Sequence, residues 1–308
     1  MNLTLSARLP FSFLSVVNSH GWVQLSPFRF DKETETLSYI FRLESGRVVE
    51  LRLRSAAGGV RVEVAGALSA AECGEVKRAV AWMLGLDMDF SEFYALARDE
   101  LKLAQAEKKA QGRVLRSPTF FEDVVKTILT TNTLWGATKR MTANLVTQFG
   151  EPLPTLNRSP DAEHTEAKGA DEGRRAFPTP QRLAGTTEAV LRAETRLGYR
   201  APYVHQLAVR AASGELDLET FKHSDLQTLE LRKQLMKIKG IGAYASANLL
   251  MLLGRYDFLT IDTWAFKIVS HEWYGSQPIG PAEVEARFEK WGKWKGLAYW
   301  FWDWSYKG

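Results

Sequence analysis

The chain has 308 residues, about twice the length of an ordinary single domain of roughly 150 residues, so two or three domains are expected. Hydrophobic residues make up 45% and charged residues 25%, which is the composition of a globular protein and excludes wholesale disorder. The formal net charge is +4, and residues 231–308 alone carry 11 Lys/Arg against 7 Asp/Glu. This basic stretch fits either a polyanionic partner or an ordinary solvated face.

Several classes of protein are excluded by what the sequence lacks. No apolar run approaches the roughly 18 residues of a membrane helix, and the N-terminal segment has no signal-peptide core. The single cysteine, Cys73, excludes a disulfide framework, a thiolate zinc site and a four-cysteine iron–sulfur cluster. The five histidines are scattered without metal-ligand spacing, so metal-hydrolase chemistry is not expected. The composition therefore predicts a protein of a reducing, intracellular compartment.

The first 65 residues are predicted to be rich in β-structure. Residues 36–43 and 48–54 alternate between apolar and polar side chains and are joined by the turn Glu44-Ser45-Gly46. Val60, Val62 and Val64 then alternate with charged residues. The pattern predicts an antiparallel meander with one face exposed to solvent.

The rest of the chain is predicted to be helical. Ser69 and Glu72 form a capping-box pattern before one helix, Ser117-Pro118 marks the start of a second, and a third spans 135–149. Residues 157–175 contain no apolar residue except three alanines and are interpreted as a mobile surface insertion. Further helices are expected near 181–195, 201–213, 225–237, 244–253, 263–272, 282–291 and 294–303. We predict an α+β chain with a β-rich domain over 1–110, including flanking helices, and an all-α body over 111–308.

The segment 235–264 contains the strongest functional signal. One amphipathic helix ends in Lys239-Gly240-Ile241-Gly242, and a second apolar helix begins immediately afterwards. The two glycines let the backbone turn sharply and approach a ligand without a Cβ atom in the way. Amides at the start of the second helix would then face outward with the helix dipole behind them, as in an anion site. Taken alone, a Gly-Ile-Gly turn between helices is equally typical of a plain tight turn.

The surroundings of this turn resemble the helix-hairpin-helix DNA glycosylase superfamily. In that family a Gly-hydrophobic-Gly hairpin is followed some 20 residues later by an essential aspartate, and Asp262 stands 20 residues after Gly242. The resemblance implies that Asp262 is catalytic and that Lys239, Gly240, Ile241 and Gly242 grip DNA phosphates. Asp262 is also well placed to cap the helix that begins at Thr263, and both roles are compatible.

Other segments resemble the same superfamily in the same order. Residues 197–204 are similar to the segment through which 8-oxoguanine DNA glycosylases touch the opposite strand, and Leu129–Asn132 is similar to the helix end that inserts an asparagine into the DNA. The N-terminal part, with Gly21-Trp22, is similar to the β domain shared by that enzyme and 3-methyladenine DNA glycosylase II. The C-terminal segment 291–298 is similar to the last helix of the latter. The resemblance implies DNA contacts by Asn132, Tyr199 and Arg200.

Two departures from the family pattern bear on the reaction. Bifunctional members carry an imine-forming lysine two residues after the second hairpin glycine, and here that position is Tyr244. A phenol cannot form a Schiff base, so a monofunctional enzyme without lyase activity is expected. The oxidised-guanine enzymes also place an arginine about five residues after the inserted asparagine, where this chain has Ala137. Excision of an alkylated purine is therefore the predicted activity.

The resemblance also implies the remaining parts of the site. An extruded base is held by stacking between flat side chains, and Tyr244, Asn248 and Trp300 are the predicted pocket residues. Carried over by position, the carbonyls of Met236, Ile238 and Ile241 are expected to bind a monovalent cation, and no cofactor is expected to be required. The expected partner is double-stranded DNA containing a damaged base, bound by a monomer that is cytoplasmic and nucleoid-associated if the source is bacterial. Excision of oxidised or deaminated bases, and non-catalytic binding of DNA damage, are the two alternatives.

Overall fold

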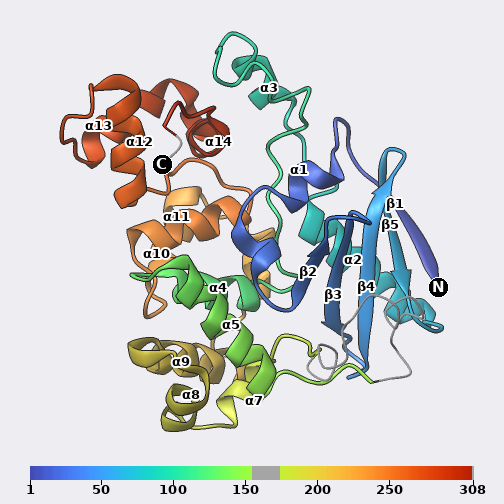
Figure 1. Cartoon of the computed structure of the whole chain (residues 1–308). Coiled ribbons are helices and arrows are strands. Elements are labelled where there is room, and N and C mark those ends of the chain that lie inside the picture. Colours follow the sequence, from blue (N-terminus) through green and yellow to red (C-terminus); the bar gives the residue numbers. More distant parts are fainter. Residues whose placement is uncertain (155–173, 307–308) are drawn as a thin grey trace. The chain divides into compact units, whose positions relative to one another are not determined.

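The computed structural model describes residues 1–154 and 174–306 (Figure 1). The chain packs into two compact units, each built from two separate stretches of sequence. Unit 1 comprises residues 1–87 and 114–219, and unit 2 comprises residues 88–113 and 220–308. The N-terminal antiparallel sheet and the helical remainder together confirm the predicted α+β class.

The sheet of unit 1 has five antiparallel strands in the order β1-β5-β4-β3-β2. Their bounds are β1 (Asn2–Ser6), β2 (Phe28–Asp31), β3 (Thr36–Arg42), β4 (Val48–Ala56) and β5 (Gly59–Val64). The three strands predicted individually are confirmed within two residues at each end, and β2 to β5 form the predicted meander. β1 adds to the free edge of β5, where Leu3 lies opposite Val62 and Leu5 opposite Val60.

The expected solvent-exposed face of the sheet is only partly exposed. Ile40 and Val48 lie on this face and are buried against Leu153 and Ala176, which belong to the chain segment after α5. Next to them Glu50 is 3% exposed and pairs with Arg174, with 2.8 Å between Oε1 and Nη1. The prediction of one wet face was thus wrong at this end, because a distant segment covers it.

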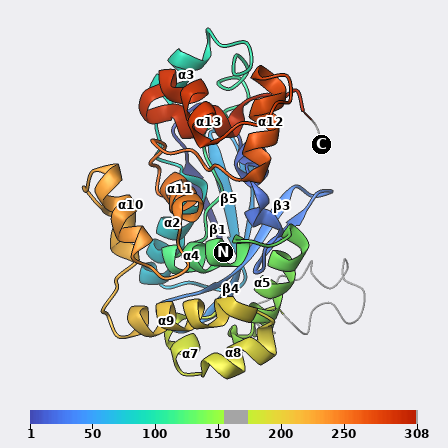
Figure 2. The same cartoon turned by 90° about the vertical axis from the view of Figure 1, so that its left-hand side faces the viewer.

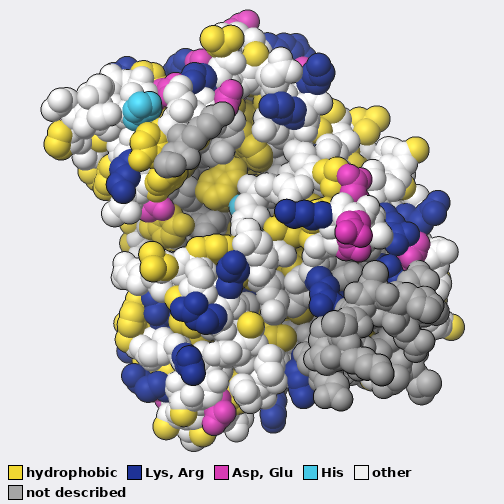
Figure 3. All heavy atoms as spheres, viewed as in Figure 1, with side chains coloured by type: hydrophobic (Ala, Val, Ile, Leu, Met, Phe, Trp, Pro, Cys, Tyr) yellow, Lys and Arg dark blue, Asp and Glu magenta, His cyan; other side chains and the backbone are white. Residues whose placement is uncertain are grey.

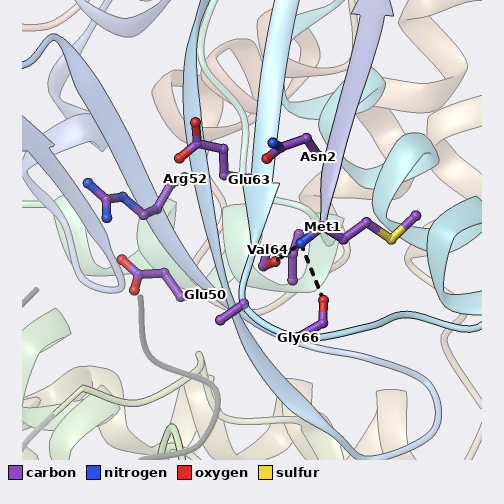
Figure 4. A pocket seen from close by; sticks show the side chains of 8 residues that line it. Met1, Asn2, Glu50, Arg52, Glu63, Val64 and Gly66 are labelled. Atoms are coloured by element: carbon purple, nitrogen blue, oxygen red, sulfur yellow. Dashed lines mark hydrogen bonds between the residues drawn. The ribbon is translucent and has the colours of Figure 1, made fainter. Parts of the chain in front are cut away.

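A shallow hollow remains open on the same face (Figure 4). Its volume is about 240 Å³, and its polar lining includes Glu50, Arg52 and Glu63. The α-amino group of Met1 donates to the carbonyl oxygen of Val64 at 2.6 Å at its edge. None of the predicted site residues lines this hollow.

In the described part of unit 1, seven helices flank the sheet or follow it in the chain. They are α1 (Phe13–Val17), α2 (Ala70–Leu84), α4 (Phe120–Thr130), α5 (Trp135–Phe149), α7 (Pro180–Ala184), α8 (Glu188–Thr195) and α9 (Ala201–Ala212). α7, α8 and α9 pack together, as Figure 2 shows, and α9 also contacts α4. The capping box of Ser69 and Glu72 on α2 is confirmed by both of its hydrogen bonds.

Two helix predictions in unit 1 were wrong. The helix expected from Ser117-Pro118 begins at Phe120, because the hydroxyl of Thr119 caps it by accepting from the amide of Glu122. The single helix expected over 181–195 is two helices, and Thr187 caps the second of them. Residues 157–173 of the expected insertion lie outside the described residues, while Arg174 and Arg175 are held by hydrogen bonds to Glu50 and Gly150.

Helix α4 carries three buried charged side chains into the core of unit 1. The ammonium group of Lys126 lies 2.6 Å from a carboxylate oxygen of Glu122, and Tyr39 of β3 donates to the other oxygen at 2.5 Å. The carboxylate of Asp123 accepts from the indole of Trp22 at 2.8 Å and from the amide of Ser117 at 2.9 Å. These bonds fix α4 against the β-rich part of the same unit.

Unit 2 consists of α3 (Ser91–Ala97) and the helices after residue 220. These are α10 (Thr228–Met236), α11 (Ala243–Leu252), α12 (Thr263–Trp273), α13 (Pro281–Phe288) and α14 (Lys295–Phe301), with a 3-10 turn η5 (Glu289–Trp294) before the last. All five predicted C-terminal helices are present, with bounds that differ by up to three residues. In the part of the chain that the structure describes, no helix is long and apolar enough to cross a membrane.

Candidate active site and nucleic-acid interface

The hairpin between α10 and α11 in unit 2 adopts the geometry that the glycine pattern predicts. Gly240 has φ +92°, a left-handed conformation that disfavours any side chain. Ile238 and Ile241 turn inward and are 3% and 5% exposed, so they anchor the turn in the core of the unit. Lys239 and Gly242 lie at the surface. The hairpin therefore presents backbone to solvent while its apolar side chains hold it in place.

Gly242, which precedes α11, has no side chain that could cover the start of this helix. It precedes α11 in an extended conformation, and no side chain caps the helix or places an acidic group in its first turn. A Cβ atom built on Gly242 would meet nothing within 4 Å. The space beside Gly242 is thus open, and the first amides of α11, which no side chain caps, lie at the positive end of the helix dipole.

Asp262 stands at the start of α12 in the same unit. Its Oδ1 accepts from the amides of Trp264 at 3.0 Å and Ala265 at 2.9 Å, so the expected role as a helix cap is confirmed. Among the described residues no hydrogen bond to Oδ2 is found, and Asp262 is exposed. One oxygen therefore fixes the carboxylate, and the other remains available to a ligand.

The charge of Asp262 acts on two tyrosines of unit 2. Burial, and secondarily the charge of Asp262, raises the pKa of Tyr244 to about 12. Burial also raises the pKa of Tyr299 of α14 strongly, with Asp262 and Tyr244 as further contributors. Both phenols are therefore neutral near neutral pH, and both lie within the electrostatic range of the Asp262 carboxylate. Tyr299 was not predicted individually.

Tyr299 is brought here by a close helix contact. Gly296, three residues earlier on α14, donates its amide to the carbonyl of Tyr256 at 2.7 Å, and a Cβ atom on it would lie 2.8 Å from that oxygen. No local signal in the sequence singles out Tyr299 within the aromatic run 299–304, because its position depends on this contact.

The other two predicted pocket residues differ in their surroundings. Asn248 lies one turn after Tyr244 on α11, is 5% exposed, and its side-chain oxygen has no hydrogen-bond partner among the described residues. Trp300, the neighbour of Tyr299 on α14, is only half-buried. The structure thus brings Tyr244, Asp262 and Tyr299 together and places Asn248 on the helical face of Tyr244.

One arginine that sequence reasoning missed ties the hairpin to the segment before Asp262. The guanidinium of Arg232 on α10 donates to the hydroxyl of Ser246 on α11 at 3.2 Å. The same group lies 4.3 Å from the centre of the Phe258 ring. Arg232 therefore links the two hairpin helices to Phe258, in the chain segment that leads to Asp262.

The predicted DNA-contact residues Asn132, Tyr199 and Arg200 meet in unit 1. Asn132 is exposed at the end of α4 with φ +46°, and Tyr199 is 46% exposed. Arg200 is only 6% exposed, and its guanidinium donates to the carbonyls of Thr131 and Asn132. It also stacks on the ring of Tyr199, 4.4 Å from the centroid. In this structure the side chain of Arg200 therefore supports the loop that carries Asn132.

Basic side chains surround this loop. Lys139 and Arg140 on α5 and Arg196 after α8 are exposed. Figure 3 shows Lys and Arg outnumbering Asp and Glu over the region of α5, α8 and α9. Such a surface favours a polyanion.

One of the three carbonyl groups predicted to bind a cation already accepts a hydrogen bond. The carbonyl of Ile238 accepts from the amide of Ile241 at 3.0 Å, which leaves it one lone pair. Among the described residues no cluster of three or more His, Cys, Asp or Glu side chains could hold a metal ion. Any cation here would thus depend on backbone oxygens.

Comparison with known proteins adds a family and a fold. Residues 125–293 match the model of the HhH-GPD superfamily of base excision DNA repair proteins, whereas no curated protein matches the chain in sequence. The structure is similar to that of MBOgg1 solved with a low-affinity DNA ligand, with TM-score 0.71, 22% identity, and coverage of 97% of this chain and 92% of that one.

Two further structures are similar over the whole chain. The 3-methyladenine DNA glycosylase of Archaeoglobus fulgidus has TM-score 0.71, 20% identity, and coverage of 98% and 96%. The 8-oxoguanine glycosylase/lyase of Clostridium acetobutylicum, bound to DNA with cytosine opposite 8-oxoguanine, has TM-score 0.70, 21% identity, and coverage of 98% and 95%. At these identities the likeness concerns the fold.

Proposed function

We propose that this chain, which belongs to the HhH-GPD superfamily of base excision DNA repair proteins, is a monofunctional DNA N-glycosylase that removes an alkylated purine from duplex DNA. The observation that carries the proposal is the pairing of Tyr244 with Asp262. The side chain that senses the carboxylate is the half-buried, neutral phenol of Tyr244, which cannot attack the sugar to form an imine. Water must then be the nucleophile.

Asp262 supplies the charge that the reaction needs. As the N-glycosidic bond breaks, positive charge develops on the sugar, and a fixed carboxylate nearby stabilises it. Oδ1 is held by two amides of α12, so Oδ2 is the oxygen that orients or deprotonates water at C1′. The proton of that water passes to the carboxylate, and the base leaves with the electron pair of the broken bond.

The surroundings of Asp262 suit a cationic base. A positively charged alkylpurine is already a good leaving group, so it needs no separate general acid. The rings of Tyr244 and Tyr299 offer stacking surfaces for an extruded base. The unpartnered oxygen of Asn248 offers an acceptor to a base N–H group. Trp300 is retained as an outer pocket residue in this proposal.

The DNA is held through two surfaces. In unit 2, the amides beyond Lys239, Gly240, Ile241 and Gly242 bind a phosphate, which positions the duplex without reading its sequence. In unit 1, Asn132 and Tyr199 enter the helix and fill the gap left by the flipped nucleotide, with Arg200 behind them. We also propose that the carbonyls of Met236, Ile238 and Ile241 bind a monovalent cation at the hairpin, and that the protein acts as a monomer.

The proposal is tested with duplexes that each contain one damaged base. Abasic product is scored before and after alkali, and each reaction is repeated with borohydride. We expect excision of alkylated purines, strand breaks only after alkali, and no trapped protein–DNA adduct. A trapped adduct would show that another lysine forms an imine and that the monofunctional assignment is wrong.

The same panel tests the alternatives. The second candidate, excision of oxidised bases, is favoured by the segment Leu197–Val204 and the likeness to an 8-oxoguanine glycosylase/lyase fold. Excision of 8-oxoguanine but not of alkylpurines would establish it. Tight binding of every lesion with no product would indicate a non-catalytic damage-binding protein.

A further inference from the structure

We infer that Leu134 is a second wedge, whose apolar side chain enters the base stack when this protein opens a duplex. The inference rests on the proposed function, because it assumes that DNA is opened at the loop carrying Asn132. It concerns a residue two positions beyond that asparagine, at the N-terminus of α5.

Leu134 is exposed to an unusual degree for a residue in an ordered turn. Its side chain is 84% exposed, which Leu101 alone exceeds among the exposed large apolar residues of the described chain. Asn132, two residues earlier, is exposed as well, and Tyr199 is 46% exposed. The hydroxyl of Tyr199 lies 3.4 Å from the carbonyl of Thr131, so these side chains share one edge of unit 1.

The loop is held firmly on both sides of Leu134. On the N-terminal side Thr131 donates its hydroxyl to the carbonyl of Ile128 at 2.8 Å, and Arg200 binds the carbonyls of Thr131 and Asn132. The guanidinium of Arg200 is buried beneath the loop. The backbone before Leu134 is therefore fixed by protein contacts.

On the C-terminal side Trp135 secures the start of α5. Its indole donates to the side chain of Gln24 at 3.0 Å, and its ring packs on Gly21, where a Cβ atom would approach within 2.4 Å. Thr131 and Asn132 before Leu134, and Trp135 after it, are thus held by protein contacts, while Leu134 itself projects into solvent. A wedge needs this arrangement, because a mobile side chain would move aside instead of separating stacked bases.

The charged residues around Leu134 indicate that the partner of its side chain is the base stack of DNA. Exposed cations follow at Lys139 and Arg140 on α5, and Arg196 is exposed in the loop before Tyr199. No acidic residue lies in the first turn of α5. A lone apolar side chain among cations and polar groups suits a ligand that is apolar inside and anionic outside, which describes duplex DNA. Leucine gains by leaving water for the space between base pairs.

The test measures opening separately from excision. The probe is a duplex with a tetrahydrofuran abasic analogue and 2-aminopurine in the adjacent position, whose fluorescence rises when it unstacks. Wild-type protein should raise the fluorescence, and Leu134→Ala should lower that rise severalfold. Leu134→Met keeps an apolar side chain and should restore it. The matched control is Leu101→Ala, because Leu101 is 87% exposed on unit 2, and it should behave as wild type.

Excision gives the second readout. Leu134→Ala should slow excision from a stable pair roughly tenfold and leave excision from a mispair or a single strand nearly unchanged, since a loose base needs little unstacking. An equal fluorescence rise for Leu134→Ala and wild type overturns the inference. Opening by wild type that is reduced in Leu134→Ala, without any excision by either protein, overturns the proposed catalysis but supports the wedge. Binding without opening overturns the wedge.

Discussion

Asp262 combines two tasks in one carboxylate, since Oδ1 caps α12 and Oδ2 faces the site. The change Asp262→Asn removes the charge but keeps an oxygen that can accept from the amides of Trp264 and Ala265. The fold and lesion binding should therefore survive. Because the carboxylate stabilises a developing cation, the single-turnover excision rate should fall about 100-fold or more.

Asp262→Ala provides the matched comparison. It removes the charge and the cap together, so it should match the rate loss of Asp262→Asn and in addition lower the free energy of unfolding by about 1 kcal/mol. If Asp262→Asn excised bases at nearly the wild-type rate, Asp262 would be a helix cap and nothing more.

Asp123 gives a second prediction for a single residue. It is fully buried, and desolvation raises its pKa from 3.8 to about 6 against the opposing bonds from Ser117 and Trp22. The folded state therefore holds its proton more tightly than the unfolded state, and ionisation of Asp123 destabilises the fold. Its contribution should increase stability as the pH falls from about 7 to 5, by about 1 kcal/mol.

The change Asp123→Asn isolates this contribution. An asparagine oxygen can still accept from the indole of Trp22 and the amide of Ser117. Urea unfolding of both proteins, followed by circular dichroism, should show the variant losing about 1 kcal/mol relative to wild type between pH 7 and 5. A difference between the two proteins that stays constant with pH would contradict the raised pKa.

At the scale of elements, the hairpin between α10 and α11 is the best place to test phosphate binding. Gly240 is a poor target, because its φ of +92° makes any side chain there strained. Gly242 has an ordinary φ of −98°, and the space around it is open. Gly242→Val should therefore fold normally and block the amides of α11.

The expected effect of Gly242→Val is uniform weakening of DNA binding. Affinities for damaged and undamaged duplexes should fall by the same factor, roughly tenfold, because phosphates carry no base identity. Gly74→Ala on α2, where an added methyl meets only the flexible end of Arg78, should bind as wild type. Loss of binding to damaged duplex alone would assign Gly242 to the base pocket.

The elements also show what could be predicted from sequence. Period-two alternation found β3, β4 and β5, and the glycine pattern found the hairpin, because both are local signals. Coverage of the outer sheet face by Leu153 and Ala176 was missed, because it depends on contacts more than 100 residues apart in sequence. The helix beginning at Phe120 was placed too early, since Pro118 signals a helix start as plausibly as Thr119 does.

The candidate site also contains residues that local sequence could predict and residues that depend on tertiary contacts. The family resemblance predicted Asp262 and Tyr244 as site residues at their spacing from Gly242, and in the structure the charge of Asp262 acts on the phenol of Tyr244. Tyr299 could not be predicted, because its position depends on the approach of α14 to Tyr256 through Gly296. The burial of Arg200 was equally invisible, since only the fold shows that its guanidinium binds the carbonyl of Thr131. Tertiary contacts therefore decide which aromatic and basic residues are available to the candidate site.

At the scale of the whole molecule, the distribution of charge predicts how binding depends on salt. The net charge is +4, and residues 231–308 contain an excess of the same size. Within that stretch Lys237 and Lys239 are exposed at the hairpin, and Lys290 and Lys293 of η5 form ion pairs with Glu100 and Glu92 at 2.8 and 2.6 Å. Only the first pair of lysines is expected to contact phosphates.

Two double variants with the same net charge show whether DNA binding depends on where the lysines lie or only on the total charge of the protein. Each phosphate contact releases counterions, so Lys237→Gln with Lys239→Gln should reduce the slope of log affinity against log salt by roughly 1 to 2. Lys290→Gln with Lys293→Gln removes as much charge but should leave the slope close to wild type, because those lysines already face carboxylates. The measurement is a fluorescence-anisotropy titration of an undamaged duplex at several salt concentrations. Equal changes in both variants would show that the molecule attracts DNA through its overall charge, and the hairpin lysines would then have no special place in the interface.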